Sequence, residues 1–368
     1  MIERNHVYKC NFGIELASED ENGFTENIAM RNNIIHHNLS AGIIMGGYDE
    51  ERGVTRNCQV LNNTLYHNDT LNGFSGEVTF QFYLENNTFK NNIIWVNPET
   101  NHAMVHFVTS GAAAQRKFDV VTNNFDYNLY YSTGNEADLT FGLNLTGNSN
   151  ASFSGLAEWK TALGGSATGD ADASHFTNPG FVTALPGATP SVDDFRLSAT
   201  SSAVNAGEPA PGYTPVAGEK DIGGVSRVAS ARVDAGCYEY LSPFQIWRDT
   251  HFELPDGDGT SANLADDGDD PDGDGVSNLM EYSQGMDANI RDGELAPKGV
   301  IDGLVYRFSY RKEASDLQYE VQTPNADLSA WSPSILTEQS DGNGQFWQEV
   351  TISENATFFM RLKVSVLP

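Results

Sequence analysis

Basic residues are scarce in this sequence. Its 368 residues include 21 Lys and Arg against 50 Asp and Glu, which gives a formal net charge of −29. Nucleic acids and anionic membrane surfaces attract proteins through basic patches, and they repel a chain that is this acidic. The charge balance therefore excludes a nucleic acid as the expected partner.

Long apolar runs are absent, and cysteines are few. No run approaches the roughly 18 apolar residues that span a bilayer, so no membrane insertion is expected. The opening residues, Met1 to His6, lack the apolar stretch of a signal peptide. Three cysteines, Cys10, Cys58 and Cys237, are too few for a disulfide framework or a zinc site. The 35 Gly and 11% aromatic residues favour a turn-rich β protein over a helical one.

Asparagine recurs in a regular frame in the first 150 residues. The frame Asn-x-x-x-x-x-Asn begins at Asn5, Asn32, Asn62 and Asn86, and a shortened copy begins at Asn123. Short stretches that alternate apolar and polar residues surround these frames, as in strands. Asn tolerates the left-handed conformation of tight turns, and stacked Asn side chains can hydrogen-bond along a ladder. The repeat predicts coils of short parallel strands that stack on one another.

On these frames, residues 1–150 resemble the right-handed parallel β-helix proteins of the pectin-lyase-like superfamily. The resemblance implies an all-β fold. Because residue 1 falls inside a repeat frame, we expect an N-terminal portion, with any signal peptide, to be missing; the alternative is that another element covers that end.

Residues 151–241 lose the repeat and become rich in Gly, Pro, Ala and Ser. Five phrases follow in order: Asn178–Phe181, Asp194–Leu197, Ser201–Gly207, Asp221–Gly224 and Asp234–Glu239. They resemble the closing region, often called choice-of-anchor Q, of secreted bacterial β-helix proteins. This resemblance implies a loop-rich cap whose polar residues are structural.

Residues 242–295 form an acidic connector that contains a calcium-loop pattern. Asp270–Glu281 fits the twelve-residue EF-hand template, with Gly275 at the sixth position. The expected Ca²⁺ ligands are Asp270, Asp272, Asp274, the carbonyl of Val276, Asn278 and Glu281. The segment resembles the thrombospondin-type-3 and dockerin calcium repeats of bacterial surface proteins. A solvated acidic linker is the alternative, and a second, irregular site upstream, at Asp256–Gly259 and Asp266–Asp269, stays open.

Residues 296–368 alternate apolar and polar residues and predict a small antiparallel β-sandwich. Together with the calcium loop, they resemble C-terminal modules of secreted proteins from Verrucomicrobia-like bacteria.

Alignment of the Asn frames places titratable residues on one outward row. The candidates for catalysis are His36, Tyr66, His67 and Lys90. β-Elimination on a uronic-acid polysaccharide needs a base, a cation and an acid, and such a row supplies all three. The loop Tyr48–Arg52 offers Tyr48, Asp49 and Arg52 for substrate binding, or paired carboxylates for glycoside hydrolysis. The alternative is that the row is an ordinary polar outer face.

These patterns together predict a monomeric extracellular or cell-surface protein that acts on or binds polysaccharide. If it is an enzyme, a polysaccharide lyase is the expected class. The alternative is a non-catalytic surface adhesin, or a glycan-binding or structural β-helix protein.

Overall fold

The computed structural model describes residues 1–49, 52–73, 75–107, 123–143, 151–162, 173–183, 190–227, 232–252, 266–325, 327–353 and 358–367. The chain divides into two compact units, Met1–Tyr240 and Leu241–Pro368. Both are mostly β, and their few helices are short. None of the helices in the described ranges is long and apolar enough to cross a membrane.

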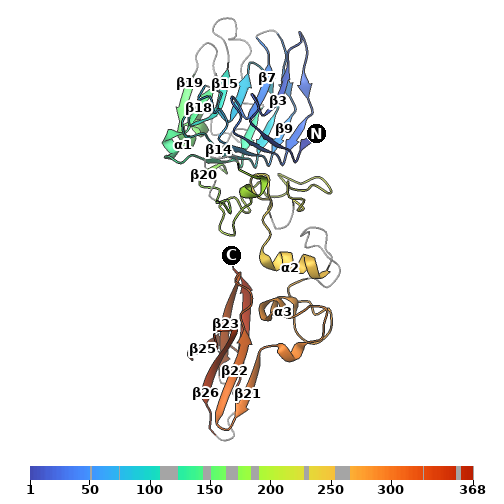
Figure 1. The fold of residues 1–368 in the computed structure, drawn as a ribbon, viewed down its shortest axis with the longest axis vertical. Helices are drawn as coiled ribbons and strands as arrows, with labels where there is room; N and C mark the ends of the chain where they lie inside the picture. The colour runs from blue at the N-terminus through green and yellow to red at the C-terminus, as the bar shows by residue number, and fades with distance from the viewer. Residues whose placement is uncertain are drawn as a thin grey trace. The chain divides into compact units, whose positions relative to one another are not determined.

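The first unit is built from parallel strands that stack in sheets, coil after coil, in a β-helix-like arrangement (Figure 1). Sheet 1 contains β1 (Ile2–Glu3), β5 (Ala29–Arg31), β9 (Gln59–Leu61), β13 (Thr88–Lys90) and β16 (Asn124–Asp126). Sheet 2 contains β2 (His6–Tyr8), β6 (Ile34–His36), β10 (Thr64–Tyr66), β14 (Ile93–Trp95), β17 (Leu129–Tyr131) and β20 (His175–Phe176). Sheet 3 contains β3 (Ile14–Ser18), β7 (Ile43–Gly47), β11 (Val78–Gln81), β15 (His102–Phe107), β18 (Thr140–Leu143) and β19 (Ala151–Ser154). A fourth, small sheet contains β4 (Thr25–Glu26), β8 (Thr55–Arg56) and β12 (Leu84–Glu85).

Side-chain alternation along the strands fills the interior of the coils. In sheet 2, Ile35, Leu65 and Ile94 lie opposite one another and are buried in the core. Phe89 of sheet 1 stacks on Phe125 of the next coil, with ring centroids 5.2 Å apart. A single coil cannot bury its own apolar face, so the neighbouring coils bury that face by stacking on it.

In each pair of adjacent asparagines, one residue forms a left-handed corner and the other joins a hydrogen-bonded ladder. Asn32, Asn62 and Asn91 have left-handed backbone, with φ between 53° and 59°. Each is followed by a residue of a buried ladder, in which Asn33 Nδ2 donates to Asn63 Oδ1 at 2.8 Å. The ladder continues through Asn92 and Asn128. Both roles expected of Asn are confirmed, on adjacent residues.

The ladder also corrects the alignment of the repeat frames. Asn63 stacks on Asn92, whereas Asn86 donates to Asn57 at a different corner of the coil. The frame at Asn86 is therefore out of register with those at Asn32 and Asn62. The spacing of only 24 residues before Asn86, shorter than the other spacings, was the sign of this shift.

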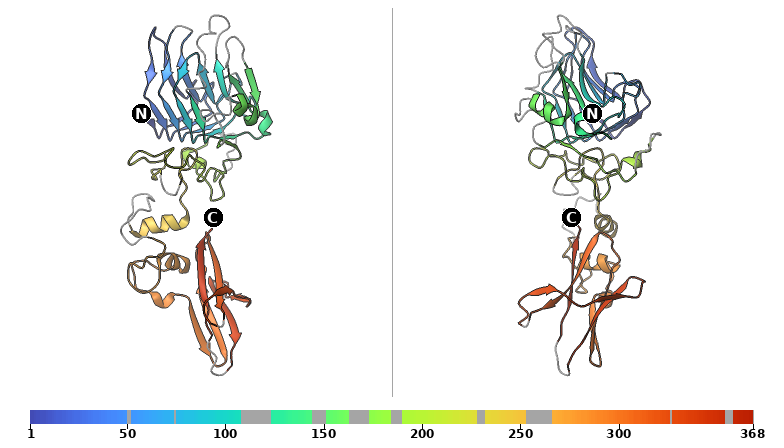
Figure 2. Two further views of the ribbon diagram at one scale, coloured as in Figure 1. Left: turned by 180° about the vertical axis from the view of Figure 1, so that it is seen from behind. Right: turned by 90° about the vertical axis from the view of Figure 1, so that its left-hand side faces the viewer.

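The last coil ends against a short helix. β19 pairs antiparallel with β18 and ends the parallel pairing of sheet 3. A 3-10 helix, η2 (Glu136–Asp138), precedes β18, and helix α1 (Gly155–Ala162) follows β19. Trp159 of α1 is fully buried and stacks on Phe141 at 5.0 Å. Figure 2 shows α1 and the N-terminus at opposite ends of the stack.

Residues 190–227 and 232–240, which carry four of the five expected closing phrases, lie along the outer face of sheet 2 (Figures 1 and 2). This segment includes a 3-10 helix, η3 (Val192–Phe195). Phe195, Leu197 and Tyr238 share a buried cluster with Ile34 and Tyr66 of the coils. The segment therefore covers outward-facing residues of several coils instead of only the end of the stack.

A buried Arg fastens this segment to the coils. The Arg227 guanidinium donates to Asn32 Oδ1 at 2.6 and 2.9 Å and to Glu239 Oε2 at 2.9 Å. Arg31 of β5 pairs with Glu219 at 2.7 Å, and Glu219 accepts a hydrogen bond from Tyr213. A buried charge is tolerated only when it is paired in this way.

The acidic residues of the closing phrases hold turns. Asp234 accepts main-chain N–H groups of Asn205 and Tyr240, both at 2.6 Å. Asp221 accepts those of Val225 and Glu239 at 2.7 and 2.8 Å. These contacts are structural.

The second unit combines short helices with two antiparallel sheets. The helices are α2 (Pro243–Phe252), α3 (Asn278–Gln284) and the 3-10 helix η4 (Gly293–Leu295). One sheet has the order β21 (Lys298–Asp302), β22 (Val305–Arg311), β26 (Gln345–Thr351), β25 (Glu338–Ser340). The other has the order β24 (Trp331–Pro333), β23 (Leu317–Pro324), β27 (Arg361–Val366). Their shared core contains Tyr306, Phe308, Val321 and Leu362, and Met280 of α3 packs against it. The expected antiparallel sheets are confirmed.

Candidate functional site

Hydrogen bonds from main-chain N–H groups to aspartate carboxylates fold the acidic loop before α3 into tight turns. The Asp270 carboxylate accepts N–H groups of Gly273, Asp274 and Gly275 at 2.9 to 3.1 Å. Gly275, at the sixth template position, has φ of 95°, a conformation that side chains resist. Asp272 accepts from the Asp274 main chain at 3.0 Å. These turns point successive carboxylates toward one another.

Five carboxylates converge at this loop in two overlapping groups. One oxygen each of Asp270, Asp272 and Asp274 lies within 4.8 Å of the others, and so does one each of Asp274, Glu281 and Asp292. Glu281 is fully buried, and neither of its carboxylate oxygens has a hydrogen-bond partner within the described part of the chain. One buried oxygen each of Asp272, Asp274 and Asp292 also lacks such a partner.

Burial and mutual repulsion make the carboxylates of this acidic loop costly to ionise. Burial, followed by the charges of Asp272 and Asp274, raises the pKa of Glu281 to about 7. Burial also raises the pKa of Asp272, whereas the three amide donors lower that of Asp270. Buried, unpaired carboxylates are costly unless a cation or a donor satisfies them. Hard divalent cations with oxygen ligands suit such a set.

The structure brings together four of the expected calcium ligands: Asp270, Asp272, Asp274 and Glu281. Val276 follows directly, and its N–H donates to Asp274 at 2.9 Å. Asn278 uses its side-chain amide to donate to the carbonyl of Asp266 at 2.8 Å, which ties the upstream turn to α3.

The sequence pattern did not predict Asp292, because this residue lies eleven residues beyond the end of the twelve-residue template. Its neighbour Arg291 donates to the carbonyl of Asp272 at 2.6 Å and so returns the chain to the loop. The only sequence feature that pointed to Asp292 was its position directly after Arg291, the first basic residue after the acidic run. Asp256 and Asp258, which belong to the second site left open, lie outside the described residues.

The row expected for catalysis is divided between two sheets. Tyr66 pairs with His36 in sheet 2, and His67 stacks on Tyr66 with ring centroids 4.0 Å apart. Lys90 lies in sheet 1, opposite Leu61, because the Asn86 frame is out of register. Its ammonium pairs with Glu208 at 2.8 Å. The structure therefore brings together His36, Tyr66 and His67 but not Lys90.

Burial changes the acid–base character of this row. His36 is 0% and Tyr66 1% exposed, with the Phe195 ring 5.5 and 5.6 Å from theirs. Burial, together with the charge of Glu77, raises the pKa of Tyr66 to about 12. Burial and the positive charges of His6, His37 and Lys9 lower the pKa of His36 to about 3. Burial, then the charge of His37, lowers that of His67 to about 4. A polymer has no direct access to His36 or Tyr66.

The His36 ring is also held by neighbouring imidazoles. His6 Nε2 lies 2.6 Å from His36 Nε2, and His36 Nδ1 lies 2.9 Å from His37 Nδ1. Each short contact needs one proton and one lone pair, so the three rings share protons in a chain. Both ring nitrogens of His36 are therefore committed to structure.

The Tyr48 loop, by contrast, lies open. Tyr48, Asp49 and Arg52 lie together: the Arg52 guanidinium is 4.2 Å from the Tyr48 ring centroid and pairs with Asp49. Arg56 of β8 lies 4.2 Å from the ring centroid of Phe24, which stands next to β4 on the preceding coil. Tyr48 and Phe24 are 52% and 51% exposed. Glu50 and Glu51, needed for the hydrolase alternative, lie outside the described residues.

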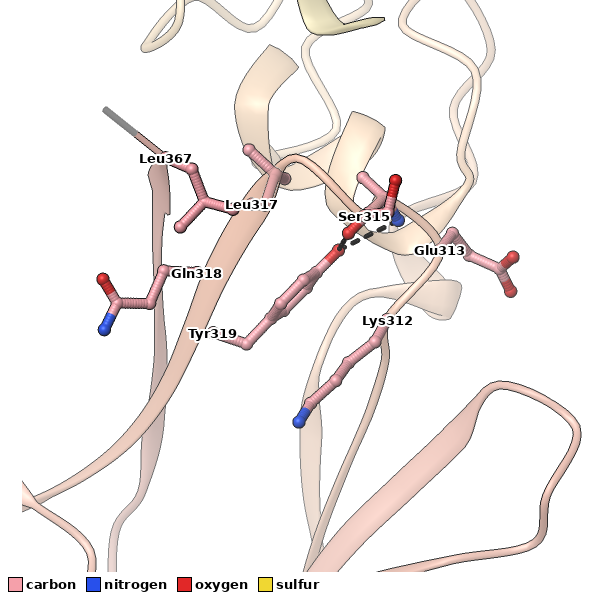
Figure 3. A pocket seen from close by; sticks show the side chains of 8 residues that line it. Lys312, Glu313, Ser315, Leu317, Gln318, Tyr319 and Leu367 are labelled. Carbon is pink, nitrogen blue, oxygen red and sulfur yellow. Dashed lines mark hydrogen bonds between the residues drawn. The ribbon is translucent and has the colours of Figure 1, made fainter. Parts of the chain in front are cut away.

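A wide surface hollow in the second unit is a further candidate for a binding site (Figure 3). Its volume is about 700 Å³, and Lys312, Leu317, Tyr319 and Leu367 line it. The Tyr319 hydroxyl is committed to the main chain of Ala314 and Ser283. Lys312 pairs with Glu338 at 2.8 Å. Within the described part of the chain, the Lys312 and Tyr319 side chains that line the hollow are thus engaged by other protein groups.

No family model matches this chain. Over 93 residues it is 37% identical to an uncharacterized protein, YwoF, of Bacillus subtilis (strain 168). The match covers 25% of this chain and 20% of that protein, so the chain spans about a fifth of its relative. The name of that relative states no activity.

Proposed function

We propose that this chain is an extracellular or surface-exposed protein whose second unit binds a structural calcium ion. The observation that carries the proposal is Glu281, fully buried with both carboxylate oxygens unpartnered among the described residues and directed at Asp274 and Asp292. The ion would replace repulsion among five carboxylates with coordination. Because Glu281 lies on α3, whose Met280 packs on the sheet core, the ion would also hold the loop to the sheets.

The donor set favours Ca²⁺ over Mg²⁺. Asp270, Asp272, Asp274, Glu281 and Asp292, with the Val276 carbonyl, provide six protein groups. Ca²⁺ takes six to eight oxygens in flexible geometry, whereas Mg²⁺ keeps several waters in a strict octahedron. Loops of this kind in extracellular modules bind Ca²⁺ with dissociation constants of about 10⁻⁴ to 10⁻³ M. An extracellular location would therefore require a dissociation constant in this range.

Calorimetric titration of the full chain with Ca²⁺ and Mg²⁺ tests this proposal. We expect saturable Ca²⁺ binding, a higher melting temperature of the second unit in Ca²⁺, and loss of both in Glu281→Gln. Glu294→Gln is the matched control, since Glu294 is an exposed acid in the same segment. Equal melting with Ca²⁺ and with a chelator would refute the proposal.

For the first unit, we propose a right-handed β-helix of the pectin-lyase-like type that binds polysaccharide without cleaving it. Support comes from two half-exposed aromatic rings, Tyr48 and Phe24, each beside an arginine. Exposed aromatic faces stack on sugar rings, and paired Arg and carboxylate groups offer hydrogen bonds to hydroxyls. The burial of His36 and Tyr66, and the pairing of Lys90 with Glu208, weigh against the lyase alternative.

A panel of neutral and uronic-acid polysaccharides separates the two functions. We expect retardation of the protein in affinity gels, weakened by Tyr48→Ala and Phe24→Ala. Tyr8→Ala, which removes an exposed aromatic from sheet 2, is the control. Release of unsaturated uronates, detected by absorbance and lost in Tyr66→Phe, would establish the lyase instead.

A further inference from the structure

Strand β21 is an edge strand that lacks the usual protection. It pairs with β22 on one side, and no described strand pairs with its other side. All five of its residues are exposed, and Val300 and Ile301 are 53% and 57% exposed (Figure 1 shows its place). An open edge with exposed apolar residues is a template for another strand.

The other edges of these sheets are protected. β25 is a three-residue polar strand, and β24 is equally short and ends in Pro333. β27 exposes the charged residues Arg361 and Lys363. Short length, proline and charge are the devices that prevent pairing at an edge. In β21, charge is confined to the two ends, Lys298 and Asp302.

The sequence of β21 is complementary to itself when two copies run antiparallel. Centred on Val300, such a pair places Lys298 of each copy opposite Asp302 of the other. Parallel pairing in register would place Lys298 opposite Lys298, and like charges in that position are unfavourable. The antiparallel arrangement also gives a two-fold axis, which closes the assembly at two copies.

The faces of the strand fit the same arrangement. Ile301 lies opposite the buried Tyr306 and so faces the core side, whereas Val300 lies opposite the exposed Arg307. On the core side, Gly299 of one copy would face Ile301 of the other. Gly299 leaves this position open for the Tyr306 ring, because the Tyr306 hydroxyl would clash with any added Cβ. Ile301 of the second copy would therefore pack beside an aromatic ring.

We infer that β21 joins two copies of this chain by antiparallel strand pairing, so that the protein is a reversible dimer and not the monomer expected from its sequence. This inference is independent of the proposed calcium and polysaccharide binding.

Sedimentation velocity of the full chain over a range of concentrations, in physiological salt, tests the dimer. We expect the mass to rise from one copy to two with concentration. Val300→Lys should abolish the rise, because it brings two ammonium groups together at the two-fold axis. Lys298→Asp and Asp302→Lys should each raise the dissociation constant about tenfold, since each creates two like-charge pairs.

Mixing the two charge variants gives the decisive result. Lys298→Asp and Asp302→Lys each oppose self-pairing, but their mixture restores two opposite-charge pairs. We expect the mixture to dimerise about as tightly as the parent, and about tenfold more tightly than either variant alone. Lys363→Asp on the edge strand β27 is the control and should behave as the parent. A chain that stays monomeric at every concentration, or a mixture no better than its components, would overturn the inference.

Discussion

The carboxylates of Glu281 and Asp292 approach within 4.8 Å of each other, although ten residues lie between them in the chain. Glu281 ends the twelve-residue loop pattern, and Asp292 stands outside it, beside η4. The acidic site therefore includes a residue from the turn that follows α3, in addition to the residues of the loop before it.

Asp292→Asn should weaken Ca²⁺ binding by about tenfold while leaving the fold intact, because one of five charged ligands becomes neutral. Calorimetric titration of this variant beside Glu294→Gln measures the effect. An unchanged dissociation constant would remove Asp292 from the ligand set.

Glu281→Gln should stabilise the metal-free protein. Without a cation, the buried Glu281 charge lies beside Asp272 and Asp274, and burial raises its pKa to about 7. The neutral amide removes that repulsion, so we expect the second unit to melt higher than the parent in chelator and lower in Ca²⁺. Only an ion-binding role predicts this reversal of order; a general packing defect would lower melting in both conditions.

Arg227→Met should destabilise the first unit by about 3 to 5 kcal/mol, because Glu239 is left as a buried, unpaired charge. Urea unfolding of the full chain measures this loss. The double variant Arg227→Met with Glu239→Leu should recover part of it. Arg196→Ala, at an exposed pair with Asp193, should change stability by less than about 1 kcal/mol.

Acid should destabilise the first unit through His36. Its pKa is lowered to about 3 in the fold against 6.5 for an ordinary imidazole. Below pH 6.5 the unfolded chain binds a proton that the folded chain does not, so stability falls as the pH drops from 6.5 toward 3. The full effect is up to about 5 kcal/mol.

Melting of the first unit at several pH values tests this dependence. His36→Phe should flatten the profile, and His175→Gln, at an exposed histidine, should not. The same profile in parent and His36→Phe would show that other groups govern acid stability.

Much of the fold of the first unit could be predicted from the sequence, because the patterns that specify it are local. Asn tolerates the left-handed corner at Asn32 and Asn62, and strand alternation places Ile35 and Leu65 inside. The proximity of Asp270, Asp272 and Asp274 follows likewise from a pattern only five residues long.

Longer-range relationships were decided by tertiary structure alone. The register of Lys90 depends on which Asn of a pair enters the ladder, and adjacent Asn residues are chemically identical. The burial of His36 and Tyr66 depends on Phe195, more than 120 residues farther along the chain. Asp292 joins the acidic site only because the chain turns back at Arg291. The sequence by itself determined the coils and the acidic loop, because neighbouring residues set local conformation. Which side chains are open to solvent, and which groups meet, was decided by packing between segments that local pattern does not connect.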